Sequence, residues 1–160
     1  NNGVPMRGWY DIVGMDFRSR ADMDGVRASV VELDALIQRE IDRGIPAERI
    51  FLAGFSQGGA VILTAALQRT ALLAGLIALS TYLPEAETAA RIDGAVQVPV
   101  FMAHGTQDPV IPLQVAEHTA ATLRTLGVEV QWQSYPLAHQ VWGEEISALA
   151  DWLQTRLQAG

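Results

Sequence analysis

Short apolar runs alternate along most of the chain with segments that have the residue pattern of helices. Three of these runs are Arg49–Gly54, Leu76–Ser80 and Val98–Ala103, and the fourth, Val128–Tyr135, alternates apolar and polar residues as a strand does. The helical patterns are Gly58–Gln68, Glu85–Arg91, Leu113–Leu126 and Glu144–Leu157, and one more precedes the first apolar run. Strands that alternate with helices at this spacing favour right-handed β-α-β units on a parallel sheet. We therefore predict an α/β fold with helices on both faces of a parallel sheet.

Two of the predicted helices carry a clear apolar stripe. In the first, which starts at Asp22 or Asp24 and ends before Gly44, the stripe consists of Val26, Val30, Leu33, Ile37 and Ile41. In the last, it consists of Ile146, Leu149, Leu153 and Leu157. Steps of three and four residues place such positions on one face of a helix. We expect these faces to pack against the rest of the fold.

The composition is that of a globular domain and excludes several kinds of function. The 160 residues are 49% apolar, carry a net charge of −7 and contain no cysteine. This length fits a single domain, and an acidic domain repels phosphate backbones, so we expect no nucleic-acid partner. No apolar stretch reaches the roughly 18 residues of a membrane span, so we expect no stable membrane insertion. The lack of cysteine excludes disulfides and thiolate sites and is compatible with any compartment; we expect the cytoplasm.

A candidate nucleophile stands directly between the first apolar run and the helix that follows it. The sequence there is Gly54-Phe55-Ser56-Gln57-Gly58, which has the G-x-S-x-G pattern of a nucleophile elbow. In such an elbow the serine lies on a strained turn, and side chains in place of the glycines would clash with the closely packed helix. The alternative is a glycine-rich turn with an incidental serine. The apolar strand before the turn and the helix after it favour the elbow.

A nucleophilic serine needs a base, and the base needs a carboxylate that orients it. In folds with this elbow the chain order is serine, then acid, then histidine. Asp108 follows the apolar run that ends at Ala103, and His139 follows the run that ends at Tyr135. Both loops are expected at the carboxyl edge of the sheet, where sites on parallel sheets form. Asp108 precedes a proline and could simply form a turn, but three agreeing placements favour a catalytic triad with Ser56.

The other two histidines fit this order less well. His118 stands in a predicted helix beside Glu117, and we expect it to be a solvated surface residue. His104 ends a predicted strand but precedes Asp108, so we interpret it as a structural residue that helps to shape the Asp108 loop. No set of histidine and acidic residues has convincing metal-ligand spacing, and the chain has no glycine-rich phosphate loop.

The triad predicts hydrolysis of an ester through an acyl-enzyme. His139 would take the proton of Ser56 as the hydroxyl attacks the acyl carbonyl, and Asp108 would orient the imidazole and stabilise its cation. Backbone N–H groups would hold the oxyanion, and one of them is that of Gln57, the residue after the nucleophile. Water would then release the acyl group.

Five segments of the chain form a specific set of motifs. They are Trp9–Ile12, Gly54–Ala60, Leu79–Pro84, His104–Pro112 and Tyr135–His139. The set resembles the bacterial carboxylesterase and acyl-protein thioesterase family, also called the phospholipase/carboxylesterase family. The resemblance implies the α/β-hydrolase fold, no cofactor, and a small-molecule carboxylic ester or thioester as substrate. It also implies an acyl pocket lined by Ile12, Met15, Phe55, Leu83 and Val110, although each of these is equally well explained as a core residue.

One feature of that family has no counterpart in this sequence. Its members carry further N-terminal strands ahead of the segment that resembles Trp9–Ile12, including a His-Gly loop that supplies a second oxyanion donor. We therefore expect one partial domain over residues 1–160, N-terminally truncated, with about four strands and a bare edge on the nucleophile strand. The missing part could come from another chain, from the loop Asn1–Arg20, or from a second copy paired along that edge. We expect self-association or pairing with a missing N-terminal segment.

Two classes of function are compatible with these residues. The first is a serine hydrolase that cleaves short-chain carboxylic esters, with lysophospholipase and protein depalmitoylase as variants. The second is a truncated hydrolase-fold module that binds a ligand or partner without catalysis. The complete set of Ser56, Asp108 and His139 favours the hydrolase, and the missing oxyanion loop favours the binding module.

Overall fold

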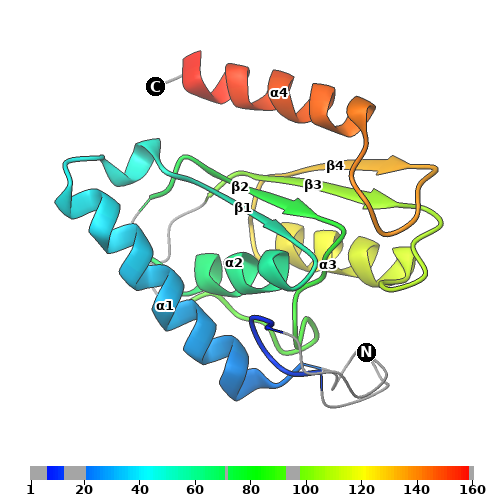
Figure 1. Ribbon diagram of the computed structural model, residues 1–160, viewed down its shortest axis with the longest axis horizontal. Helices are drawn as coiled ribbons and strands as arrows, with labels where there is room; N and C mark the ends of the chain where they lie inside the picture. The colour runs from blue at the N-terminus through cyan, green and yellow to red at the C-terminus, as the bar shows by residue number, and fades with distance from the viewer. Residues whose placement is uncertain (1–6, 13–20, 71, 93–97, 159–160) are drawn as a thin grey trace.

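The computed structural model describes residues 7–12, 21–70, 72–92 and 98–158 of the chain. Its elements in chain order are α1 (Met23–Asp42), the short 3₁₀ helix η1 (Ala47–Arg49), β1 (Phe51–Phe55), α2 (Gln57–Leu67), β2 (Gly75–Leu79), β3 (Val100–Gly105), α3 (Leu113–Thr125), β4 (Val130–Tyr135) and α4 (Gly143–Gln158). The strands form one sheet, with α4 on one face and α1, α2 and α3 on the other (Figure 1). The predicted α/β fold with helices on both faces is confirmed.

The described sheet is parallel throughout, and its four strands lie side by side in sequence order. β1 pairs with β2, β2 with β3, and β3 with β4. All four carboxyl ends therefore lie at the same edge, on the right in Figure 1. The loops that follow β1, β3 and β4 meet at this edge, which is where parallel sheets place their chemistry.

Apolar side chains pack on both faces of the sheet. The larger cluster lies between the sheet and α2 and α3 and includes Leu63, Leu76, Met102 and Leu123. A smaller cluster joins α1 to α2 and includes Val26, Val30 and Val61. Full burial of one such side chain stabilises the fold by about 1.5–3 kcal/mol. The predicted stripe of α1 is thus in contact with the core, and the side chain of Asp22 caps the helix by accepting from the backbone N–H of Asp24.

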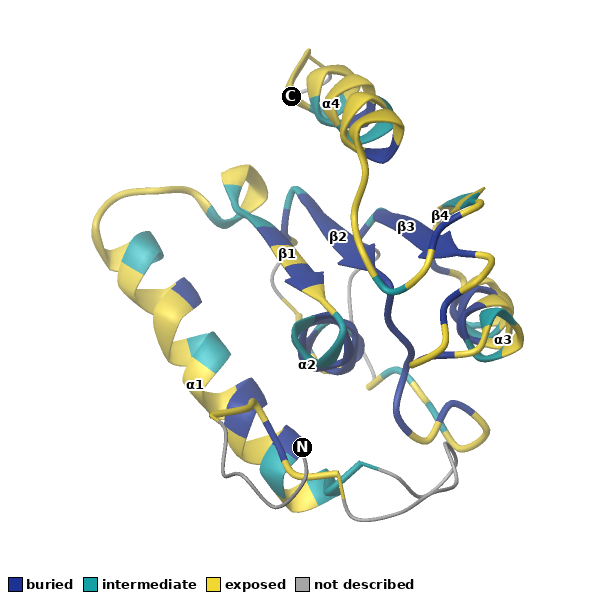
Figure 2. Ribbon diagram, turned by 45° about the vertical axis from the view of Figure 1, so that its right-hand side comes forward, coloured by how far each residue is buried: buried dark blue, intermediate teal, exposed yellow. Residues whose placement is uncertain are grey.

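β1 forms the edge of the described sheet and is less covered than its neighbours. β2 and β3 are buried along their whole length, whereas Ala53 and Phe55 of β1 are exposed (Figure 2). Parallel sheets normally have both sides covered. The strand that leads into the candidate nucleophile is therefore partly accessible, as is β4 at the opposite edge of the described sheet.

The prediction of a helix over Glu85–Arg91 is wrong, because these residues form turns and irregular backbone. Glu85 has a φ of 51°, in the left-handed region that a right-handed helix cannot contain. The backbone N–H groups of Thr88 and Ala89 bond to carbonyls three residues earlier, as in isolated turns. Ala86 is buried against the core, so packing of this segment overrides the helix propensity of its alanines.

The predicted apolar stripe of α4 is correct in its middle and wrong at its ends. Leu149 and Leu153 pack against the cluster on this face of the sheet, whereas Ile146 and Leu157 are 51% and 62% exposed. The residue that fixes the helix orientation is Trp152, which is 4% exposed. A Cβ on Gly75 of β2 would lie 2.5 Å from the Trp152 ring, so the glycine makes room for the indole.

The same face of α4 buries a carboxyl group, that of Glu145, which is 2% exposed. Burial raises the pKa of Glu145, and a backbone hydrogen bond with Trp142 opposes the shift without cancelling it. A raised folded-state pKa gives stability that is complete while the carboxyl is protonated and is lost as the pH rises through that pKa. The ordinary pKa of the group is 4.5, so the loss takes place above this value.

We therefore predict that Glu145→Gln raises the thermal stability of the protein at pH 8, because the amide removes a buried charge and keeps the shape. Melting curves at several pH values should show a Tm difference that shrinks toward pH 4, where the wild-type carboxyl is protonated. Glu144→Gln is the matched control, since Glu144 is exposed in the same helical turn. A lower Tm for Glu145→Gln than for wild type at pH 8 would contradict this assignment.

Candidate active site

Ser56 lies on the sharp turn between β1 and α2, with φ 53° and ψ −120°. Residues other than glycine rarely adopt such a conformation, and it costs of the order of 1–3 kcal/mol. Two hydrogen bonds hold the strained backbone in place. The N–H of Ser56 donates to the carbonyl of Leu79 at 3.0 Å, and the hydroxyl of Thr81 donates to the carbonyl of Ser56 at 2.6 Å. The turn thus presents its serine in the manner of a nucleophile elbow.

Close packing accounts for one of the two glycines of the elbow pattern. A Cβ on Gly54 would lie 2.4 Å from backbone atoms of Gly58 and Gly59, so no side chain fits there. A Cβ on Gly58 would meet only the indole nitrogen of Trp9, at an ordinary 3.5 Å. The predicted clash is therefore confirmed for Gly54 and wrong for Gly58.

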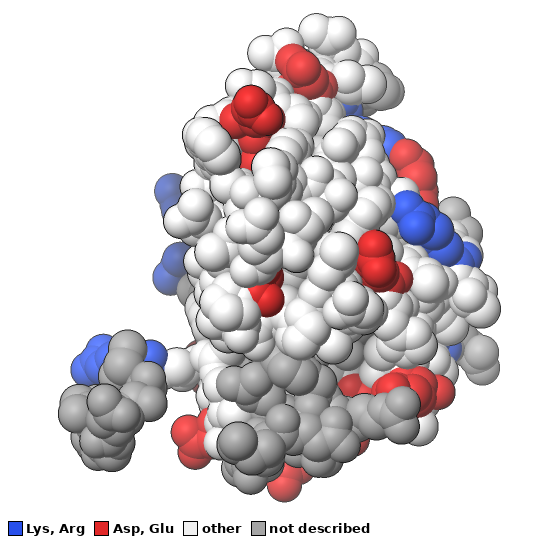
Figure 3. All heavy atoms as spheres, turned by 90° about the vertical axis from the view of Figure 1, so that its right-hand side faces the viewer, with Lys and Arg blue, Asp and Glu red and all other residues white. Residues whose placement is uncertain are grey.

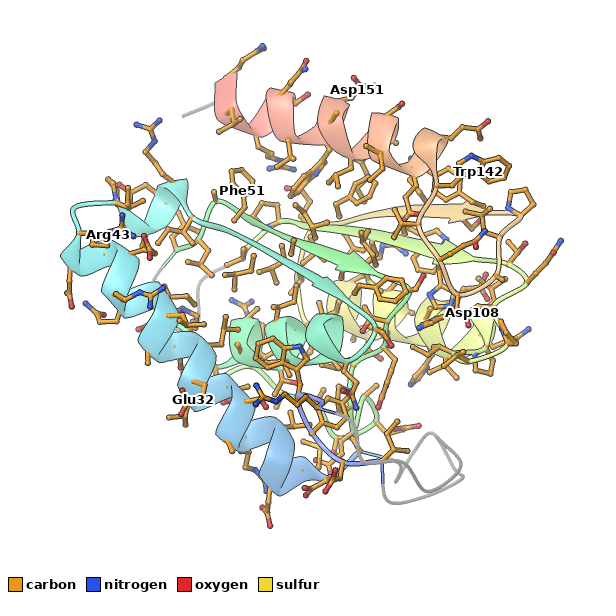
Figure 4. All side chains as sticks on the ribbon, in the orientation of Figure 1. Glu32, Arg43, Phe51, Asp108, Trp142 and Asp151 are labelled. Atoms are coloured by element: carbon orange, nitrogen blue, oxygen red, sulfur yellow. The ribbon has the colours of Figure 1, made fainter. Side chains whose placement is uncertain are left out.

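The imidazole of His139 lies between the side chains of Ser56 and Asp108. Its Nε2 is 3.1 Å from Oγ of Ser56, and its Nδ1 is 2.7 Å from Oδ2 of Asp108. A carboxylate only accepts hydrogen bonds, so Nδ1 carries the proton and Nε2 is free to accept the proton of the serine hydroxyl. The structure thus brings together three side chains from the loops after β1, β3 and β4. Asp108 is labelled at this edge of the sheet in Figure 4.

The environment of Asp108 keeps its carboxyl group ionised. Its Oδ1 accepts the backbone N–H groups of Val110 at 2.8 Å and Ile111 at 2.9 Å. Burial alone would raise the pKa of Asp108, but the hydrogen bonds from Ile111, His139 and Val110 outweigh it and hold the pKa below the ordinary 3.8. The stability that this carboxylate contributes is therefore present above pH 3.8 and is lost as the pH falls through the lowered pKa.

Gln57 opens α2 and acts through both its backbone and its side chain. Its N–H belongs to the first turn of the helix, where backbone donors have no acceptor within the helix. Its side-chain Nε2 donates to the carbonyl of Tyr10 at 2.8 Å, and its Oε1 accepts the N–H of Trp9 at 3.2 Å. The carboxamide thus fastens the Trp9–Tyr10 segment to the turn that carries Ser56.

Two of the predicted acyl-pocket residues lie beside His139 and Asp108. The ring of Phe55 is 42% exposed, and its centroid is 4.7 Å from that of His139. Val110 is 41% exposed and lies in the Asp108 loop, to whose carboxylate its N–H donates. Both are accessible apolar side chains at the rim of the site.

The other predicted pocket residues have different surroundings. Ile12 is exposed and forms an isolated bridge with Ala21. Leu83 is buried in the cluster between the sheet and α2 and α3. Met15 lies outside the described residues. The assignment of Ile12, Met15 and Leu83 to an acyl pocket therefore stays a prediction.

A cavity of about 270 Å³ runs along the exposed side of β1. Its lining is largely apolar and consists of Trp9, Leu33, Ala53, Gly54, Phe55, Gly58, Val61 and Ile62. Of the predicted pocket residues that the structure describes, Phe55 alone lines it. The cavity touches Phe55 and Gly58, so it follows the edge strand up to the nucleophile turn.

The remaining histidines and acidic residues of the described segments were compared with the requirements of a metal site. His118 is exposed on α3, as predicted. Among the residues that the structure describes, no group of three or more histidine and acidic side chains could hold a metal ion.

Two contacts at the site were not predicted from the sequence. One is the Thr81 hydroxyl on the carbonyl of Ser56, and the other is the clamp that the Gln57 side chain forms on Trp9 and Tyr10. Thr81 could have been selected from the sequence, because it is a polar residue just beyond a fully apolar strand. No local signal existed for the clamp, which joins residues 47 positions apart.

Comparisons with known proteins agree with this geometry. The model of the phospholipase/carboxylesterase family matches residues 1–157. Acyl-protein thioesterase 1 of Neurospora crassa is 41% identical over 167 residues, which cover 98% of this chain and 68% of that protein. The carboxylesterase SOBER1 of Arabidopsis thaliana is 30% identical over 163 residues, which cover 99% of this chain and 72% of that protein. Its crystal structure is similar with a TM-score of 0.88 at 29% identity, covering 98% of this chain and 77% of that chain.

These similarities confirm the predicted α/β-hydrolase fold. They do not support the resemblance to bacterial members in particular, because the sequence relatives are fungal and plant proteins.

Proposed function

The chain belongs to the phospholipase/carboxylesterase family of hydrolases, and we propose that it cleaves short-chain carboxylic esters through Ser56, His139 and Asp108. The observation that carries the proposal is the pair of hydrogen bonds made by His139, at 3.1 Å to Ser56 and 2.7 Å to Asp108. The relatives bear the names of a thioesterase and a carboxylesterase. Esters and thioesters both present an acyl carbonyl to a nucleophile, so thioesters are a second substrate class for the same reaction.

The first half of the proposed reaction forms an acyl-enzyme. Nε2 of His139 accepts the hydroxyl proton of Ser56 as Oγ attacks the acyl carbon. The ionised Asp108 holds the Nδ1–H of the imidazole and stabilises the imidazolium cation. Nε2 then gives its proton to the leaving alcohol as the bond between the acyl carbon and that oxygen breaks.

The second half reverses these proton movements with water. His139 accepts a proton from water as the water oxygen attacks the acyl carbon. The bond between that carbon and Oγ of Ser56 then breaks, Oγ takes the proton back from His139, and the carboxylic acid leaves. In both halves the negative oxygen of the tetrahedral intermediate needs backbone donors, and the N–H of Gln57 is the proposed first donor. One such donor is worth about 10²–10³ in kcat. Each step uses only side chains, backbone and water, so the proposal requires no cofactor.

The surface around the site supports an uncharged acyl substrate. Figure 3 looks onto the side of the molecule where the strands end, and the centre of this face carries few charged side chains. Phe55 and Val110 offer exposed apolar groups there. None of the helices within the described part of the chain is long and apolar enough to cross a membrane. The sparse charge and the exposed apolar groups of this face favour a small uncharged ester over a phosphate-bearing lipid.

We predict that kcat/KM for p-nitrophenyl esters is highest for acetate or butyrate and falls about tenfold or more toward palmitate. The reason is that Phe55 and Val110, the exposed apolar groups beside the triad, give a long chain little surface to bury unless it enters the cavity along β1, which we assign to a partner strand. Initial rates across the ester series measure the profile, with the Ser56→Ala protein as the blank for each ester. A rate that rises up to palmitate would favour the alternative function of a protein depalmitoylase or lysophospholipase.

The exposed side of β1 supports a proposal about partners. Within the described residues β1 pairs only with β2, and its free side carries the apolar cavity. An unpaired edge strand is a template for pairing with another strand. We propose that residues 1–160 form one partial domain, which self-associates along β1 or pairs with a separate N-terminal segment.

We accordingly predict that the protein alone is a dimer or larger species in size-exclusion chromatography with light scattering. Ala53→Lys should shift it toward the monomer, because a lysine on an edge strand opposes strand pairing. Val31→Lys on α1 is the control, since Val31 is 67% exposed and belongs to a helix rather than to the edge strand. A wild-type protein that stays monomeric at all concentrations would contradict self-association.

A further inference from the structure

His104, the fifth residue of β3, is a buried titratable group that the proposed reaction does not use. It is 1% exposed, and its ring stacks on that of Trp132 with a centroid distance of 6.4 Å and an interplanar angle of 15°. An imidazole buried without hydrogen bonds is unfavourable compared with an apolar side chain of similar shape. Its polar atoms therefore need an explanation other than packing.

The contacts of His104 define its tautomer. Its Nε2 is 2.9 Å from the backbone carbonyl of Ile111 and 3.5 Å from Oδ2 of Asp108. A carbonyl oxygen and a carboxylate only accept hydrogen bonds, so Nε2 carries the proton. The other nitrogen, Nδ1, is buried and has no hydrogen-bond partner within the described residues. A proton on Nδ1 would be a buried unsatisfied donor, so the Nε2–H tautomer is the one that fits.

The Nε2–H group of His104 is linked to the carboxylate of Asp108 in two ways. The direct link is the approach of Nε2 of His104 to Oδ2 of Asp108, the same oxygen that accepts the Nδ1–H of His139. The indirect link consists of two hydrogen bonds made by the backbone of Ile111. His104 holds the carbonyl of this residue, and the N–H of the same residue donates to Oδ1 of Asp108 at 2.9 Å.

We propose that His104 is a positioning residue that fixes the carboxylate of Asp108 in the orientation in which Oδ2 meets His139. The inference rests on the proposed function, because it assigns to His104 a task within that triad. It goes beyond a merely structural part in the Asp108 loop, since it locates the task in a single N–H group. A residue that only filled space here would be replaceable by any ring of similar size.

Three substitutions separate the N–H group from the ring. His104→Phe keeps a ring that can stack on Trp132 and removes the donor. His104→Gln places an amide N–H at about the reach of Nε2. His104→Asn also carries an amide, but its shorter side chain places the donor near the position of Nδ1, away from Ile111 and Asp108.

The first readout is the proton NMR signal of the Nδ1–H of His139, which a short hydrogen bond to a carboxylate moves far downfield of the amides. We expect wild type and His104→Gln to show it, and His104→Phe and His104→Asn to lose it or move it upfield. His118→Phe, at an exposed position on α3, is the control and should leave it unchanged. This readout needs no turnover, so it tests the positioning role even if the protein fails to hydrolyse esters.

The second readout is the kinetics of p-nitrophenyl acetate hydrolysis. We expect His104→Phe and His104→Asn to lower kcat about tenfold with KM unchanged, and His104→Gln to restore most of the loss. If His104→Phe does not fold, the comparison of the glutamine and asparagine variants carries the same test. An unchanged signal and kcat in His104→Phe, or equal values for His104→Gln and His104→Asn, would overturn the inference.

Discussion

Replacing Ser56 with alanine is expected to lower kcat for p-nitrophenyl acetate hydrolysis about 10⁶-fold. Alanine removes the only atom that can form the acyl-enzyme in the proposed reaction, while the oxyanion donors and the rim of the site remain. The substitution should leave the fold intact, because the Ser56 side chain makes no capping bond to α2 and, among the residues that the structure describes, its hydrogen-bond partner is His139. Initial rates and a melting curve measured on the same sample separate lost chemistry from lost structure.

Ser147→Ala is the matched control for this variant, since Ser147 is an exposed serine on α4. Its kcat should equal that of wild type. A Ser56→Ala protein that kept more than about one hundredth of the wild-type rate would show that another residue attacks the substrate.

Replacing Asp108 with asparagine is expected to lower kcat about 10⁴-fold with little change in the fold. The reason lies in the different partners of the two carboxylate oxygens. Oδ1 accepts from the N–H groups of Val110 and Ile111, so the amide oxygen of an asparagine must take this position. The amide nitrogen then takes the place of Oδ2 and donates to Nδ1 of His139. That imidazole is held with its proton on Nε2, where it cannot accept the proton of Ser56.

Steady-state kinetics test this prediction, and NMR of the His139 ring shows which nitrogen carries the proton. Asp24→Asn is the control, because Asp24 is an exposed carboxylate in the first turn of α1. A loss of less than tenfold in Asp108→Asn would mean that the carboxylate does not orient the base.

Much of the fold follows from patterns that short stretches of sequence contain. Three apolar runs became β1 to β3, because buried parallel strands need continuous apolar residues, and the alternating segment became the half-covered β4. The stripe from Val26 to Ile41 became the packed face of α1 for the same local reason. The exceptions arose where a tertiary contact decided the outcome. Burial of Ala86 shaped the turn that begins at Glu85, and the fit of Trp152 over Gly75 rotated α4 away from the predicted stripe.

In the candidate site, too, local sequence patterns predicted some features and tertiary contacts decided the others. Ser56, Asp108 and His139 could be selected from chain order and from their positions after strands, and the structure brings their side chains within hydrogen-bond distance. The contact of Thr81 with Ser56 joins two loops that meet only in the folded chain, and that of His104 with Ile111 depends on the conformation of the loop that follows β3. The acyl pocket was inferred from resemblance alone. A side chain such as that of Leu83 gives no local sign of whether it faces the core or a substrate.

The most direct test of the account is labelling of the folded protein with a fluorophosphonate, followed by mass spectrometry of its peptides. The hydrogen bond from Ser56 to His139 predicts one covalent adduct on Ser56, absent from Ser56→Ala and much slower to form in Asp108→Asn. A folded protein that stays unlabelled, or that carries the adduct on another residue, would contradict the account and favour a hydrolase-fold module that binds without catalysis.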